Sequence, residues 1–223
     1  MTYAEVQTQV ANYLNRTDLT SEIQTFINVA IRKIERKREY QHMRVRYNLA
    51  IALNDYLVAN PITNYKRFIS AFIKTTDDYR YPMREASNEE AMRCYPSVLY
   101  DTGRPELITV LPATETTLTP DVSPTNKLLL RPTADQSYTI ELYAYQYSPA
   151  LDGVTYTTNW WTANYPEVVI YGAMEEAEAF MLNDEQVAKW ASMKEDAVKM
   201  IHDSEVKEEL GKMPQTVRSM YVV

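Results

Sequence analysis

The sequence has 223 residues, of which 45% are apolar and 24% are charged, and these are ordinary values for a globular protein. Its net charge of −7 argues against a protein that binds nucleic acid over its whole surface, because such binding depends on lysine and arginine. No apolar stretch is long enough to span a bilayer. The opening residues lack a signal-peptide pattern, so we expect the protein to be made in a cytosol and to stay there or enter a particle assembled there.

The first 42 residues predict a helical hairpin. Thr2 and Glu5 have capping-box spacing at the start of the first helix. The second helix begins near Thr20 or Ser21, and its apolar residues recur at spacings of three and four. We interpret its other face either as a contact surface between subunits or as a solvated helix face. That basic face holds Arg32, Lys33, Arg36 and Lys37.

Residues 43–158 predict a domain rich in antiparallel strands, with one short helix capped by Ser87 or Asn88. Alternating residue types predict strands over 45–51 and 138–147. We also expect strands over 65–74, 106–111 and 128–131, with 79–82 pairing back as a hairpin. One face of the longest strand is apolar and the other carries three tyrosines. We therefore expect this sheet to be covered on one side only.

Residues 159–212 predict a second helical hairpin, and residues 213–223 a C-terminal arm without helical period. Pro166 suits a first helical position, and Gly211 and Pro214 suit a helix end. The element order predicts an α+β fold, in which the terminal helices form an antiparallel bundle around an inserted antiparallel β-rich domain. The expected structural core includes Phe26, Ile27, Trp160, Trp161, Tyr171 and Trp190.

The sequence contains no pattern that is typical of a catalytic, metal or cofactor site, so we expect a protein that is not an enzyme and has no cofactor. His42 lies among arginines, and we expect it to be exposed. Cys94 is the one cysteine, and we expect it to be buried as a small apolar group. Glu175 and Glu176, together with Glu178, are expected on the solvated face of their helix rather than as paired catalytic acids.

The pair Trp160-Trp161 is the most prominent aromatic feature. One interpretation is that the two rings fill the junction between the sheet and the C-terminal helices. The other is that they form a stacking platform for a sugar or a base.

Several runs resemble phage head-to-tail adaptor proteins, mainly those of podoviruses. The runs are Gly103-Arg104-Pro105, Leu128-Leu129-Leu130-Arg131-Pro132, Tyr138–Tyr145, Thr158-Asn159-Trp160-Trp161 and Tyr165–Ala173. The resemblance covers most of the chain and departs from the family pattern at residues 54–64.

This resemblance implies a structural virion protein at the head–tail junction, made in the host cytoplasm and without membrane contact. It implies a closed ring of about twelve copies that docks on the portal protein and connects it to a tail nozzle or tail hub protein. DNA would pass through the lumen without specific binding. The resemblance also implies a portal-binding arm, to which we assign Met213, Pro214, Val217, Met220, Tyr221, Val222 and Val223.

Two other functions stay open on the sequence alone. The tyrosine-rich strands would suit a carbohydrate-binding or host-surface-binding tail module. The basic face of the second helix would suit a DNA-binding protein.

Overall fold

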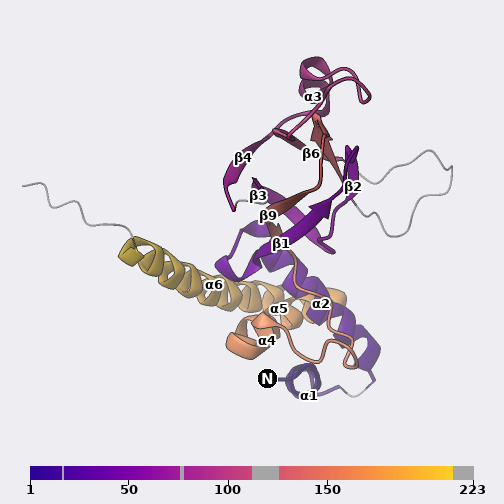
Figure 1. Ribbon diagram of the computed structural model, residues 1–223. Helices are drawn as coiled ribbons and strands as arrows, with labels where there is room; N and C mark the ends of the chain where they lie inside the picture. Colours follow the sequence, from indigo (N-terminus) through magenta and orange to yellow (C-terminus); the bar gives the residue numbers. More distant parts are fainter. Residues whose placement is uncertain (17, 76–77, 112–125, 213–223) are drawn as a thin grey trace, which may run out of the picture. The chain divides into compact units, whose positions relative to one another are not determined.

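The computed structural model describes residues 1–16, 18–75, 78–111 and 126–212. The chain divides into two units (Figure 1). The helical unit combines Met1–His42 with the chain from Ser148 onward, and the strand unit is Met43–Tyr147. The strand unit is therefore an insert in the helical unit. Its first boundary lies after residue 42, and the chain returns to the helical unit at Ser148 rather than at residue 159.

The helical unit contains α1 (Tyr3–Leu14), α2 (Thr20–Lys37), α4 (Trp160–Asn164), α5 (Pro166–Phe180) and α6 (Asp184–Lys212). The predicted capping box is confirmed, because the Thr2 side chain accepts the Glu5 N–H and the Glu5 carboxylate accepts the Thr2 N–H. Pro166 occupies the start of α5 as predicted, where its missing N–H removes no helical hydrogen bond.

Helix α5 is the centre of the helical unit, since it packs against α1, α2 and α6. Its approach to α2 is unusually close. A Cβ atom added to Gly172 would lie 2.8 Å from the Cβ of Ala30, so a glycine is required at this crossing. The surrounding core is aliphatic and includes Val6, Val10, Ile23, Ile27, Ile31, Val169 and Ala173.

The strand unit is built on a curled seven-stranded sheet with the order β1-β9-β3-β4-β6-β7-β2. These strands are β1 (Arg44–Ile51), β2 (Leu57–Ala59), β3 (Tyr65–Lys74), β4 (Arg80–Glu85), β6 (Leu107–Leu111), β7 (Lys127–Arg131) and β9 (Tyr138–Gln146). Neighbouring strands run antiparallel except β4 and β6. Two short strands, β5 (Thr102–Gly103) and β8 (Thr133–Ala134), pair separately. The other elements are α3 (Asn88–Cys94), which Ser87 caps, and the 3-10 turn η1 (Gln41–Met43).

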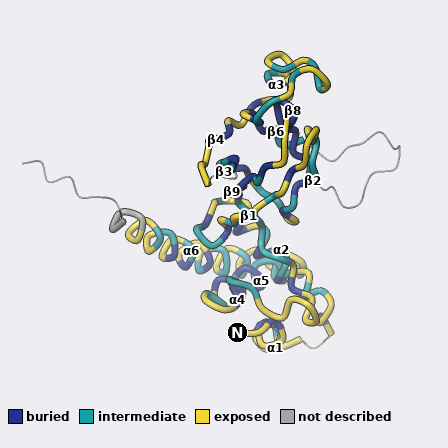
Figure 2. The backbone as a smooth tube through the Cα atoms, in the orientation of Figure 1, coloured by how far each residue is buried: buried dark blue, intermediate teal, exposed yellow. Residues whose placement is uncertain are grey.

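The two faces of the sheet differ in burial along β9. Ile140, Leu142 and Ala144 are fully buried in the main core of the strand unit, whereas Tyr143 and Tyr145 on the opposite face are half-buried. Buried segments follow β3, β9 and β6 in Figure 2. The alternation in the sequence thus predicted correctly which side of β9 faces the core. The fold as a whole is mixed α+β, also as predicted.

Candidate functional site

A buried carboxylate organises the centre of the helical unit. Glu35 of α2 is fully buried, and its Oε1 accepts a hydrogen bond from Nε1 of Trp161 at 2.9 Å. Its Oε2 accepts the backbone N–H of Ser148 at 3.1 Å. Burial raises the pKa of Glu35, but His42, Ser148 and Trp161 lower it by more, so the pKa lies below its usual value. The carboxylate is therefore charged at neutral pH and joins three distant segments of the chain.

Aromatic rings surround this carboxylate. His42 stacks on Trp160, with the ring centroids 3.7 Å apart and the planes 6° from parallel. Its Nε2 lies 3.9 Å from Oε1 of Glu35, which is too long for a hydrogen bond. The His42 side chain is only 10% exposed, so the expectation of an exposed histidine was wrong. The sequence missed this packing because it joins Trp160 to residues more than a hundred positions earlier.

The tryptophan pair does not form an open stacking platform. Trp161 is fully buried, and Tyr40 packs edge-on against it at 4.9 Å between centroids. Trp160 is half-buried between His42 and Tyr165. The described contacts of both rings lie within the helical unit. The other residues expected in the core are Ile27, which is fully buried, and Phe26, Tyr171 and Trp190, which are half-buried.

The basic face of α2 is partly neutralised by the chain itself. Nζ of Lys33 lies 2.6 Å from Oε1 of Glu176 on α5, and Lys37 forms a salt bridge with Glu195 on α6. Arg36 is exposed and Arg32 is half-buried. These intrachain pairs leave less positive charge for a partner than the sequence suggests.

The glutamates of α5 do not lie free on a solvated face. Glu176 has a side chain that is only 15% exposed, and Glu175 forms a salt bridge with Lys194, a buried lysine of α6. The expectation that both residues lie on a solvated helix face was therefore wrong, because Lys33 of α2 and Lys194 of α6 form salt bridges with them. Such pairs join helices and present no pair of acids to a substrate.

Cys94 also differs from expectation. It is exposed at the end of α3 and is not buried as an apolar filler. Within the described part of the chain, no three His, Cys, Asp or Glu side chains are placed to hold a metal ion. No described helix is long and apolar enough to cross a membrane. The arm residues Met213, Pro214, Val217, Met220, Tyr221, Val222 and Val223 lie outside the described residues.

The most prominent cluster of charge in the strand unit lies on the half-exposed face of its sheet, which we call the outer face. At its centre is Glu141 of β9, whose side chain is only 4% exposed. Its Oε1 accepts a hydrogen bond from Arg46 of β1 at 3.0 Å, and its Oε2 accepts one from Arg80 of β4 at 3.1 Å. The hydrogen bond from Arg80 and the nearby positive charge of Arg46 hold the pKa of Glu141 below its usual value, despite its burial.

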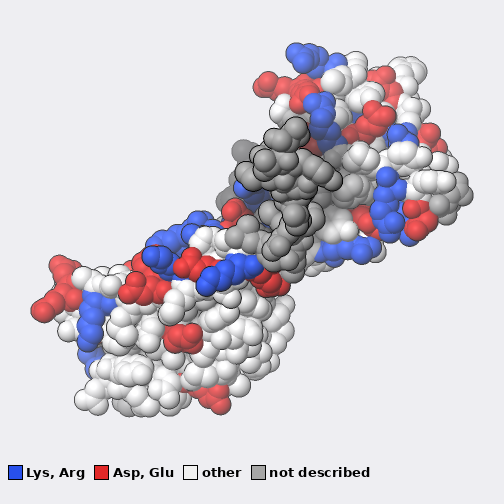
Figure 3. Space-filling model, turned by 90° about the vertical axis from the view of Figure 1, so that its left-hand side faces the viewer, with Lys and Arg blue, Asp and Glu red and all other residues white. Residues whose placement is uncertain are grey.

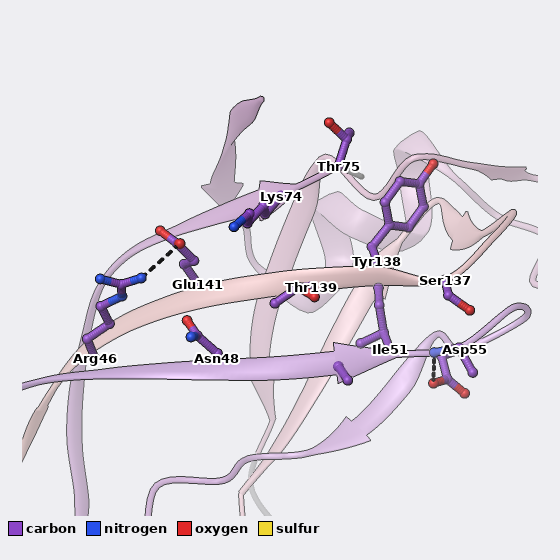
Figure 4. Close-up of a pocket in the computed structure, with 12 residues that line it drawn as sticks. Arg46, Asn48, Ile51, Asp55, Lys74, Thr75, Ser137, Tyr138, Thr139 and Glu141 are labelled. Carbon is purple, nitrogen blue, oxygen red and sulfur yellow. Dashed lines mark hydrogen bonds and ion pairs between the residues drawn. The ribbon is translucent and has the colours of Figure 1, made fainter. Parts of the chain in front are cut away.

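Both arginines keep much of their side-chain surface in solvent. The side chain of Arg46 is 51% exposed and that of Arg80 is 45% exposed. Arg46 and Glu141 line a cleft of about 690 Å³ together with Asn48, Lys74 and Thr139, which come from three neighbouring strands (Figure 4). Glu141 thus fixes two cations on an open surface, which is an arrangement suited to binding anions.

Comparison with known proteins defines the class of the protein. Residues 1–218 match the sequence model of a family of phage head-to-tail adaptors. The family is described as SU10 adaptor protein, and the chain belongs to it, because the match spans nearly all of the 223 residues. A search of the curated proteins found no match. The resemblance seen in the sequence is therefore confirmed, and the protein is a structural phage adaptor of the virion head–tail junction rather than an enzyme.

Proposed function

We propose that the chain forms a closed ring of about twelve copies, which docks on the portal and connects it to the tail nozzle or hub. The observation that carries this proposal is the family match over residues 1–218, which leaves no large part of the chain for another activity. In this ring the DNA passes through a lumen without sequence-specific binding.

Exposed apolar side chains of the helical unit support its role in protein contacts. Phe180 is 60% exposed at the end of α5, and Leu182 is 87% exposed in the turn that follows. Phe180 also packs against Phe26 of α2, with 5.7 Å between ring centroids, so its position is fixed. We call Phe180 and Leu182 the apolar tip. Large apolar side chains that stay in water in one subunit are typical of surfaces that a partner covers.

The distribution of charge agrees with this role. In Figure 3 the lower part, which is the helical unit, shows a broad area that is mostly uncharged and is interrupted by isolated Asp or Glu side chains. Depletion of charge is typical of the centre of a protein interface. We assign the subunit contacts to this unit, with the apolar tip and the basic face of α2 (Arg32, Lys33, Arg36 and Lys37) as its parts, and the portal contact to residues 213–223.

Mass photometry tests the proposal directly, with the full chain measured alone and with the portal protein of the same phage. A ring of twelve copies adds about 310 kDa to the portal particle, which is twelve times the subunit mass of 25.9 kDa. An unshifted portal peak beside free monomer would refute docking. A shift by a much smaller mass would refute the closed ring.

Two double variants test whether the helical unit makes the contacts between subunits. Phe180→Ser with Leu182→Ser removes the apolar tip and should prevent assembly without unfolding the subunit, because both side chains are already exposed. The matched control is Leu99→Ser with Tyr100→Ser, which changes two residues of the strand unit that are at least as exposed. Equal loss of assembly in both variants would contradict the assignment of the subunit contacts to the helical unit.

A further inference from the structure

Leu182 combines an exposed apolar side chain with a backbone conformation that leucine rarely adopts. Its φ is 59°, in the left-handed region, because it follows the C-cap residue Met181 at the end of α5. The N–H of Leu182 bonds to the carbonyl of Ala179, and the next N–H along the chain bonds to the carbonyl of Glu178. This helix ending normally has glycine in the left-handed position. A leucine there costs free energy, and because 87% of Leu182 is exposed, packing within the subunit offsets little of that cost.

A small pocket with an apolar interior opens between α2 and α6. Ile34 and Tyr40 of α2, which are almost fully buried, line it together with Val198 of α6. Its volume is about 220 Å³, which is less than the roughly 300–1,000 Å³ of sites for drug-sized ligands. An apolar cavity of about 150 Å³ accommodates a benzene ring. The pocket therefore has room for one large apolar side chain rather than for a larger ligand.

The surroundings of this pocket and of Leu182 have complementary charges. The pocket is also lined by the exposed cations Lys33, Arg36 and Lys37 of α2. The two lysines form salt bridges with acids of α5 and α6, so we take Arg36 as the cation that meets an incoming acid. Directly after Leu182, α6 begins with two exposed acids, Asp184 and Glu185. Complementary charges around an apolar contact fix its orientation and exclude wrong pairings.

We infer that Leu182 of one copy inserts into this pocket of a neighbouring copy, where Arg36 meets the acids that begin α6. The inference rests on the proposed assembly of copies and names the site that receives the apolar tip. Leu182 cannot fill the pocket of its own chain, because the ten helical steps of α6 from Asp184 to Lys194, which lines the pocket, span about 15 Å. A tip and a pocket at different places on one subunit make a head-to-tail contact, which builds a ring if the rotation closes.

Cysteine cross-linking of the full chain tests this pairing, with the native Cys94 replaced by serine. One chain carries Leu182→Cys and another carries Val198→Cys, and the two are mixed and oxidised with and without the portal protein. The mixture should give a covalent dimer of about 52 kDa, twice the subunit mass of 25.9 kDa, much faster than either chain alone. The matched control uses Leu99→Cys in place of Leu182→Cys. Leu99 is 80% exposed in the strand unit, and its variant should cross-link no faster than the single chains.

The variant Leu182→Gly separates assembly from folding. Glycine suits the left-handed position, so this variant should unfold at the same or a higher urea concentration than the unmodified chain. It should nevertheless fail to complete the ring on the portal, because the side chain that fills the pocket is lost. Leu182→Met keeps a large apolar side chain and should assemble as the unmodified chain does.

Three results would overturn the inference. The mixture could cross-link no faster than the Leu99→Cys control, or Leu182→Gly could assemble as well as the unmodified chain. Rapid cross-linking of Leu182→Cys alone would assign Leu182 to a contact between two tips. Failure of the proposed function gives a different result, in which the unmodified chain adds no mass to the portal while the cross-link between Leu182→Cys and Val198→Cys still forms without it.

Discussion

The crossing of α2 and α5 makes a quantitative prediction about stability. Gly172→Ala would place a Cβ 2.8 Å from the Cβ of Ala30, about 1 Å closer than a normal carbon contact. Both atoms are attached directly to helix backbones, so no side-chain rotation relieves the contact and the helices must separate. Overpacking of this kind costs about 1–3 kcal/mol. The higher helix propensity of alanine offsets about 1 kcal/mol of that, so we expect a net destabilisation of about 1 kcal/mol.

A double-mutant cycle with Ala30→Gly isolates the steric part. Ala30→Gly removes the opposing Cβ, so in that background Gly172→Ala should stabilise the helical unit by about 1 kcal/mol, its propensity gain. The coupling between the two positions is then about 1–3 kcal/mol.

Urea unfolding monitored by tryptophan fluorescence measures these free energies in the right part of the molecule, because Trp160, Trp161 and Trp190 all belong to the helical unit. If Gly172→Ala stabilised the protein equally in both backgrounds, the close approach of the two helices would be refuted.

Other measurements test the remaining structural claims. Trp161→Phe removes the indole donor to Glu35 and should lower the free energy of unfolding by about 1.5–3 kcal/mol; an unchanged value would contradict the buried hydrogen bond. The pKa of the Glu35 carboxylate is lowered in the folded state, so the stability that it contributes is present at neutral pH and should be lost as the pH falls through that pKa. The free energy of unfolding measured against pH should therefore fall in acid, and it should fall less in Glu35→Gln. Burial raises the pKa of Tyr40 and of Tyr65 to about 12, so both should stay protonated in the folded protein at a pH where the tyrosines of the unfolded chain ionise. The free energy of unfolding should therefore fall between about pH 10 and 12. Ionisation of all tyrosines of the folded protein near pH 10 would contradict this prediction. Cys94 should react with a thiol reagent at the rate of an exposed thiol without unfolding, and slow reaction limited by unfolding would show that it is buried after all.

The regular elements were predictable because their signals are local. The capping box at Thr2, the proline at the start of α5 and the alternation along β9 each depend on a few neighbouring residues. Long strands with a strict alternation also fix their own orientation, since a shift by one residue would expose the apolar side chains. The order of helices and strands along the chain then followed without knowledge of any long-range contact.

The short elements were not predictable in the same way. Strand β2 has only three residues. It exists because Leu57 and Val58 pair with Leu129 and Leu128 of β7. The parallel pairing of β4 with β6 likewise depends on residues that lie far apart in the sequence. Such strands are stabilised by their partners rather than by their own propensity.

The buried carboxylates show the same limit for sites. In the sequence Glu35 is one of two acids in a basic run, and Glu141 alternates with apolar residues like any exposed strand residue. Each is buried because its partners come from elsewhere in the chain, Trp161 for the first and Arg46 and Arg80 for the second. An acid near several cations in sequence looks like a surface ion pair, and only the structure shows that it is desolvated.

The position of Glu35 explains how an insert of this length is accommodated. The chain leaves the helical unit at His42 and returns to it at Ser148. The carboxylate of Glu35 lies close to both, because it is next to the His42 imidazole and accepts a hydrogen bond from the Ser148 N–H. Within the strand unit, the strands that begin and end the insert are neighbours, with Arg44 opposite Tyr145. Each unit therefore holds the two points at which the chain enters and leaves it close together. A buried charge with fixed partners specifies this arrangement more strictly than an apolar contact would, because any other pairing would leave the carboxylate unsatisfied.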